Sequence, residues 1–123
     1  MKNRIYKFRA WNKENKTMSP PATLNEICKF AILAGREIGD EVEFMQFTGL
    51  LDKNGKEIYE GDCLGGTWEM TYVAWCDIQG GWEIFTREKE CMACFGDVHW
   101  YEVVDDKEKE AIGNIYETPE LLK

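Results

Sequence analysis

Apolar and polar positions alternate along residues 5–11, and the basic side chains fall on one face of that pattern. Successive side chains of a strand point to opposite faces, so this period of two predicts a half-buried strand. A polar turn follows at residues 12–16, and Met18 begins a short return. Pro20 and Pro21 end ladder pairing there, because proline has no backbone N–H to donate.

A period of three to four residues replaces the alternation between about residues 24 and 34. Thr23 and Glu26 fit a capping box, in which each side chain bonds the other residue's backbone N–H, and Gly35 stands where helices commonly end. These features predict a helix over residues 24–34. Its apolar stripe is wide, so we expect it to cover a sheet or to meet a partner chain. The stripe comprises Leu24, Ile27, Cys28, Phe30, Ala31, Ile32 and Leu33.

The clearest turn signal is Asn54-Gly55, between an apolar approach at residues 42–48 and an apolar return at Ile58-Tyr59. Asn-Gly supplies the positive φ angles that tight hairpin turns need. A strand, a hairpin turn from Asp52 to Gly55 and a second turn at Gly61-Asp62 are therefore predicted.

Short apolar runs separated by glycine pairs fill the rest of the chain. The predicted strands cover residues 63–64, 68–76, 82–86, 98–104 and 111–116, with turns at Gly65-Gly66 and Gly80-Gly81 and a last helical turn at 118–122. Short strands at this spacing are typical of a small barrel or sandwich.

Composition narrows the class of protein. A chain of 123 residues that is 44% hydrophobic fits one domain, and no window approaches the roughly 18 apolar residues of a spanning helix. The basic N-terminus meets aromatic and basic residues where a signal peptide would be apolar. We therefore expect a cytoplasmic protein with free thiols and no membrane segment.

Charge is uneven along the chain. Residues 1–16 carry six Lys and Arg against one acid, a net charge of +5, whereas residues 17–123 carry nine against 22, a net of −13. An acidic body repels phosphate backbones, which argues against general nucleic-acid binding. We expect the basic strand to meet acidic neighbours, or else the acidic surface of another copy.

Three separate segments, in this order and spacing, resemble the YopX family of phage and prophage proteins. They are Tyr6-Lys7-Phe8-Arg9-Ala10-Trp11-Asn12 with Met18, Met45-Gln46-Phe47-Thr48-Gly49-Leu50 continuing through Asp52-Lys53-Asn54-Gly55 to Ile58-Tyr59-Glu60-Gly61-Asp62, and Ile112-Gly113-Asn114-Ile115-Tyr116-Glu117 with Pro119-Glu120-Leu121-Leu122.

The resemblance implies one mainly β (α+β) domain over residues 1–123, with an N-terminal β and helical part (1–48) and an SH3-like β-barrel (49–123). It also implies a phage or prophage origin in a bacterial cytoplasm, and it supplies no catalytic residues. Residues 19–43 and 87–96 match the shared pattern poorly, so a function particular to this member could lie there.

Cys91 and Cys94 have the spacing of a redox pair or of half a zinc site. A complete site would need His99 and a cysteine brought across by the fold, either Cys63 or Cys76. The pair is not in a βαβ unit, which argues against thioredoxin-type chemistry. We favour ordinary thiols and predict no metal or cofactor.

Other candidates for chemistry have structural explanations. Glu57, Glu60 and Asp62 could bind Mg²⁺ or act as acid and base, but a turn is expected there and we favour it. His99 lies on a predicted strand, and Ser19, the sole serine, stands beside two prolines, so a Ser-His-Asp triad is not expected. Neither glycine pair has the lysine and helix of a phosphate loop.

Five tryptophans could form a stacking platform for single-stranded nucleic acid, but such platforms need a basic groove, so we favour core packing or an interface. They are Trp11, Trp68, Trp75, Trp82 and Trp100.

We therefore predict a non-enzymatic accessory protein that forms homo-oligomers and binds a host or phage protein, with no small-molecule substrate. The alternative is a nucleic-acid-linked module or a DNA mimic in phage replication or regulation. Its contact strip would be Lys2, Arg4, Lys7, Arg9, Lys13 and Lys16.

Overall fold

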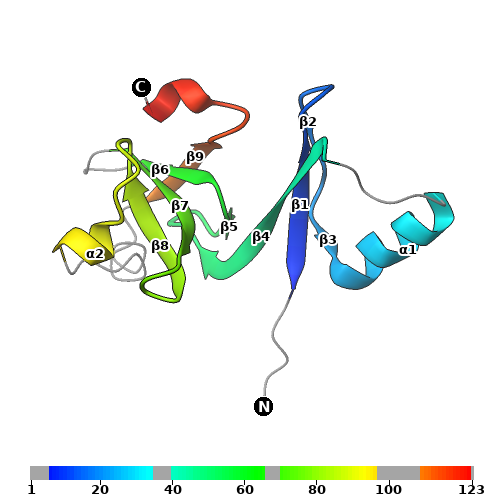
Figure 1. Cartoon of the computed structure of the whole chain (residues 1–123), viewed down its shortest axis with the longest axis horizontal. Helices are drawn as coiled ribbons and strands as arrows, with labels where there is room; N and C mark the ends of the chain where they lie inside the picture. Colours follow the sequence, from blue (N-terminus) through cyan, green and yellow to red (C-terminus); the bar gives the residue numbers. More distant parts are fainter. Residues whose placement is uncertain (1–5, 35–39, 66–69, 97–108, 123) are drawn as a thin grey trace, which may run out of the picture. The chain divides into compact units, whose positions relative to one another are not determined.

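The computed structural model describes residues 6–34, 40–65, 70–96 and 109–122 (Figure 1). The chain divides into two compact units, unit 1 (residues 1–47) and unit 2 (residues 48–123). The sequence prediction set the boundary between its two parts after residue 48. Each unit is described by itself below.

The described part of unit 1 is a small antiparallel sheet with one helix. Strand β1 pairs with β2, β3 and β4, and the ladder of β1 with β4 runs from Phe8 opposite Gln46 to Asn12 opposite Val42. The elements are β1 (Lys7–Asn12), β2 (Thr17–Met18), β3 (Ala22–Thr23), α1 (Leu24–Ala34) and the first part of β4 (Val42–Leu51).

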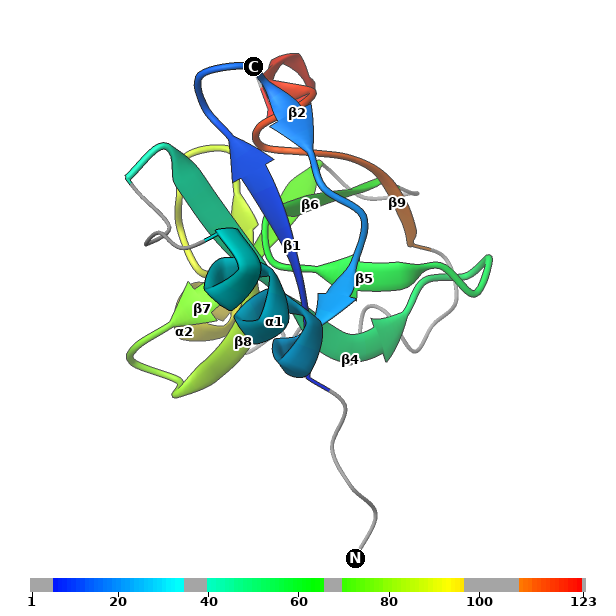
Figure 2. The ribbon, with the colours of Figure 1, turned by 90° about the vertical axis from the view of Figure 1, so that its right-hand side faces the viewer.

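Helix α1 begins directly at the end of β3 (Figure 2), as its capping box requires. The backbone N–H of Thr23 donates to Glu26 Oε1 at 3.1 Å, and the backbone N–H of Glu26 donates to Thr23 Oγ1 at 3.3 Å. These two bonds satisfy N–H groups that have no partner inside the helix. The prediction of a helix over residues 24–34 is confirmed at both ends.

The described part of unit 2 contains strands β5 to β9 and two short helices. Strand β5 joins the first sheet, in the order β2-β1-β4-β5, and a second antiparallel sheet has the order β8-β7-β6-β9. The elements are β5 (Glu57–Tyr59), β6 (Asp62–Gly65), β7 (Thr71–Cys76), β8 (Gly81–Thr86), α2 (Met92–Gly96), β9 (Glu110–Asn114) and the 3₁₀ helix η1 (Pro119–Leu122).

The core of unit 2 is built from one apolar side chain of each of its shorter strands. These side chains are Ile58, Leu64, Val73, Ile84 and Ala111, and all five are buried. Trp82 and Met92 pack against them from the edge. Because the contributing residues lie as much as 53 positions apart (58 to 111), burial of this cluster holds the strands of unit 2 together.

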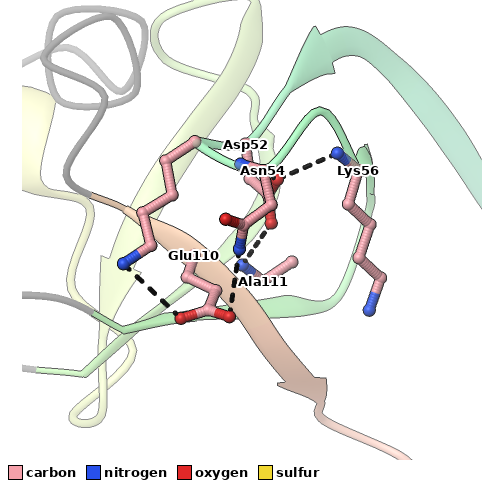
Figure 3. Close-up of polar contacts among 6 residues, drawn as sticks. Asp52, Asn54, Lys56, Glu110 and Ala111 are labelled. Atoms are coloured by element: carbon pink, nitrogen blue, oxygen red, sulfur yellow. Dashed lines mark hydrogen bonds and ion pairs between the residues drawn. The ribbon is translucent and has the colours of Figure 1, made fainter.

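The predicted hairpin turn is confirmed, and Asp52 closes it (Figure 3). Asp52 Oδ1 accepts from the backbone N–H groups of Asn54 at 2.8 Å and Lys56 at 2.9 Å, while Oδ2 accepts from the N–H of Ala111 at 3.0 Å. Gly55 has φ +81°, the positive φ that the Asn-Gly signal predicts. One carboxylate thus joins the turn to β9.

The mainly β prediction is confirmed in the form of two sheets with few helices. The closed SH3-like barrel stays a prediction, and the strand predicted at 98–104 lies outside the described residues. The strands predicted at 82–86 and 111–116 are β8 and β9 with slightly shifted ends, while β3 and α2 were not anticipated. No helix in the described part of the chain is long and apolar enough to cross a bilayer.

Candidate functional site

Three cysteines from two segments of unit 2 converge beside α2. Cys76 is the last residue of β7, and Cys94 lies within α2. Cys91 precedes α2, and its backbone forms an isolated antiparallel β-bridge with Phe85 of β8. The β7–β8 hairpin and the chain after β8 therefore deliver the three thiols to one place. Cys76 and Cys91 are buried, whereas Cys94 is exposed.

The three sulfur atoms lie within 4.8 Å of one another. Cys76 Sγ and Cys94 Sγ are 3.7 Å apart, and the side-chain amide of Gln79 contacts Cys94 Sγ at 3.6 Å. Asp77 and Glu90 are among the residues lining the hollow around this thiol cluster, which we define as Cys76, Cys91 and Cys94. The arrangement can bind a thiophilic ion or form a disulfide.

The surroundings act differently on two of these thiols. A hydrogen bond from the backbone of Gln79 is the main cause that lowers the pKa of Cys76; burial opposes it, and the thiol of Cys94 assists it. Burial is the main cause that raises the pKa of Cys91 to about 11, and the neighbouring thiols of Cys76 and Cys94 add to the rise. Crowding thus disfavours a second thiolate unless a cation accompanies it.

Of the two cysteines considered as a third ligand, the fold brings Cys76 to the pair. Cys63 instead lies fully buried in β6, where burial and the adjacent Asp62 raise its pKa to about 11. His99, the fourth ligand considered, lies outside the described residues. The sequence contained the Cys91–Cys94 spacing, but the approach of Cys76 depends on the β7–β8 hairpin.

The acidic residues at the second turn have structural partners. Asp62, which is buried, accepts the backbone N–H of Tyr59 at 2.9 Å through Oδ2. The hydroxyl of Tyr59 donates to Glu57 Oε1 at 3.1 Å. Glu60 and Gly61 form the turn itself. The turn that we favoured for these residues is present.

Ser19 also has a structural role, because its hydroxyl oxygen accepts the backbone N–H of Ala10 at 2.8 Å. The tryptophans do not share one use. Trp11 is buried, while Trp75 is half-exposed and meets Trp82 edge to face, with ring centroids 5.3 Å apart. Trp68 and Trp100 lie outside the described residues.

An apolar groove of about 440 Å³ opens in unit 1. Phe8 and Ala10 lie two residues apart on β1, and Phe44 of β4 is opposite Ala10, so their side chains share one face of the sheet. The segment from Ser19 to Ala22 and the first turn of α1 form the other wall. We call this the unit 1 groove; its apolar lining includes Phe8, Ala10, Pro21, Ile27, Val42 and Phe44.

The described side chains of α1 are partly or largely exposed. None of the helix side chains that the structure describes, residues 24–29, is buried, and Leu24 is 53% exposed. The sequence predicted that the helix would either cover a sheet or meet a partner chain. It could not predict the groove, which needs the pairing of β1 with β4 as well as the course of the Pro20-Pro21 segment.

The basic strand has partners within unit 1. Lys13, in the turn directly after β1, forms an ion pair with Glu43 at 2.9 Å. Lys7 instead lies over the ring of Phe47, with its Nζ 5.6 Å from the ring centroid. Lys2 and Arg4 lie outside the described residues.

Fold and site together define a small, mainly β protein with an apolar groove in one unit and a thiol cluster in the other. The family model described as "YopX protein" matches residues 7–123, and the chain belongs to the YopX family. No curated protein matches the chain.

Among solved structures, the chain is similar to the crystal structure of protein EF1440 from Enterococcus faecalis. The two share 25% sequence identity with a TM-score of 0.65, and the match covers 98% of this chain and 100% of that one. The two proteins therefore share a similar fold over nearly their whole lengths.

Proposed function

We propose that this YopX family protein is a non-enzymatic interaction module that assembles with further copies of itself through the unit 1 groove. The observation that carries the proposal is the groove. It is an apolar hollow with a volume of about 440 Å³, and none of the described side chains of the adjacent helix is buried. Association that covers apolar surface of this kind is favourable, because it removes that surface from water. The phage or prophage setting and the cytoplasmic location are part of the proposal, as the family resemblance implies them.

The charge of the two units favours a second copy as the occupant of the groove. Residues 1–47 carry eight Lys and Arg against six acids, a net charge of +2, and residues 48–123 carry seven against 17, a net of −10. Unit 1 of one copy and unit 2 of another therefore attract each other once they are close, whereas the net charge of −8 on each chain makes whole copies repel at longer range.

Unit 2 also offers the apolar side chains that such a contact needs. Ile78, in the β7–β8 turn, is 84% exposed, and Phe95 of α2 is 77% exposed. Both border the hollow at the thiol cluster, with Asp77 and Glu90 nearby. We propose that this knob, defined as Ile78 and Phe95, enters the unit 1 groove of the next copy.

Light scattering during size-exclusion chromatography tests the assembly. The wild-type protein is expected to have a mass above that of the 14.3 kDa chain at low or at high salt, because salt screens both the attraction between unlike units and the repulsion between chains of net charge −8. Phe44→Ser, in the groove, should give single chains. Leu51→Ser alters an exposed residue of the same strand outside the groove and should leave the assembly intact.

A monomeric wild-type protein at both salt concentrations would contradict self-association. If the Leu51→Ser control dissociates as readily as Phe44→Ser, the groove is not the contact.

A second candidate function is mimicry of DNA, and the net charge of −10 on residues 48–123 is the observation that favours it. Direct nucleic-acid contact by the basic strip is less favoured, because Lys13 pairs with Glu43 and Lys7 lies over Phe47. Gel-shift titration with single- and double-stranded DNA separates the two. A shift that weakens steeply with salt would establish direct contact instead of mimicry.

A further inference from the structure

We propose that Cys76, Cys91 and Cys94 bind one zinc-class divalent ion. Zinc sites in proteins are tetrahedral with zinc–sulfur bonds of about 2.3 Å, which places neighbouring sulfur atoms about 3.8 Å apart. Cys76 Sγ and Cys94 Sγ are already 3.7 Å apart, and all three sulfurs lie within 4.8 Å of one another. Small side-chain rotations would complete a three-sulfur face.

The fourth position of the tetrahedron faces the hollow beside the cluster. Cys94 is exposed, and the carboxylates of Asp77 and Glu90 belong to residues that line this hollow. Water from this hollow can therefore complete the coordination, since zinc accepts an oxygen ligand beside thiolates. A site with three protein ligands and one open position is also accessible from solution.

A thiophilic ion accounts for all three cysteines, whereas a disulfide accounts for two. A Cys76–Cys94 disulfide would leave Cys91 buried beside it without a role. Soft thiolate ligands select zinc and similar ions over magnesium and calcium. The geometry therefore favours zinc over the oxidised pair.

The ion would hold α2 against the β7–β8 hairpin. Helix α2 spans Met92–Gly96, five residues, which is too short to be stable alone in water. Cys91 precedes this helix, Cys94 lies within it and Cys76 ends β7, so one ion would join α2 to the β7–β8 hairpin. This role goes beyond the proposed assembly through unit 1.

The experiment uses the full chain, reduced and then loaded with Zn²⁺ or Co²⁺ before excess metal is removed. Wild type is expected to retain about one zinc per chain by elemental mass spectrometry, and cobalt should show intense thiolate charge-transfer absorption with tetrahedral visible bands. Cys76→Ser, Cys91→Ser and Cys94→Ser should each reduce retained zinc by at least about tenfold. Cys28→Ser removes an exposed thiol of α1 and should retain zinc like wild type.

The cobalt spectrum of wild type does not depend on whether a variant folds, so it decides the matter alone. Absence of thiolate charge-transfer absorption in the reduced, cobalt-loaded protein would overturn the proposal. So would a Cys76–Cys94 disulfide found as the stable form after zinc loading under reducing conditions. Because these readouts do not involve oligomer mass, their failure is distinct from failure of the assembly proposed for the unit 1 groove.

Discussion

Asp52 binds three backbone N–H groups from two segments that are distant in sequence. Its carboxylate closes the turn at Asn54 and Lys56, and it also accepts the N–H of Ala111 on β9. Figure 3 shows Asn54 and Glu110 completing the contact between turn and strand through a 3.1 Å hydrogen bond. A polar side chain inside unit 2 therefore specifies which strand the hairpin meets.

Replacing Asp52 with alanine should lower the free energy of unfolding by about 1–3 kcal/mol, since three backbone donors, one of them buried, lose their acceptor. Urea denaturation measures the change. The control is Lys53→Ala, which removes an exposed 3.7 Å ion pair with Glu110 and should cost less than about 1 kcal/mol. Equal losses for the two variants would contradict the role given to Asp52.

Acid should weaken the protein in part through the same carboxylate. Burial opposes the ionisation of Asp52, but the hydrogen bonds from Ala111, Lys56 and Asn54 outweigh it and lower its pKa. The unfolded chain, with an ordinary value of about 3.9, therefore takes up the proton first as the pH falls. This contribution is complete above that value and is lost as the pH falls through the lowered pKa.

Asp52→Asn removes the titrating group at nearly constant shape. The difference in unfolding free energy between wild type and Asp52→Asn should be largest near neutral pH and should shrink below about pH 4. Denaturation midpoints across this range provide the measurement. A difference that stays constant with pH would show that ionised Asp52 contributes nothing.

At the scale of elements, the start of α1 depends on its capping box. Thr23→Ala removes one of the two reciprocal bonds and should destabilise the helix by about 1 kcal/mol. Hydrogen exchange of the α1 amides should therefore accelerate several-fold, most at Glu26. The control Asn25→Ala changes an exposed residue of the first turn and should leave these rates nearly unchanged.

Elements with local signals were predictable from the sequence. The capping box and the spacing of the apolar stripe defined α1, and Asn54-Gly55 defined the hairpin. The closing segment is local too, because Asn114 Oδ1 accepts the backbone N–H groups of Tyr116 at 2.9 Å and Glu117 at 2.8 Å. Each of these contacts spans four residues or fewer, yet the predicted strand over 111–116 ran two residues past the end of β9 and missed the turn at Asn114.

Features made by distant segments were not predictable. Strand β3 has two residues and owes its existence to pairing with Phe8 and Lys7 of β1. Helix α2 has five residues and too little periodicity to be recognised. The thiol cluster required Cys76 to arrive from another strand, so the spacing of Cys91 and Cys94 indicated half of it.

At the scale of the whole molecule, opposite charges and complementary apolar surfaces belong to different units. A contact between the groove of one copy and the knob of another joins unlike surfaces, so an open assembly ends in one unused groove and one unused knob. A self-complementary dimer would use the same surface on both chains. The two arrangements respond differently when singly disabled chains are mixed.

Light scattering of such a mixture tests the assembly most directly. Phe44→Ser disables the groove, and the double variant Ile78→Ser/Phe95→Ser disables the knob, so each should be a single chain by itself. Mixed in equal amounts, they should form a dimer of twice the 14.3 kDa chain mass, because one intact groove then meets one intact knob. A mixture that remains at the single-chain mass, under conditions where wild type assembles, would contradict this account.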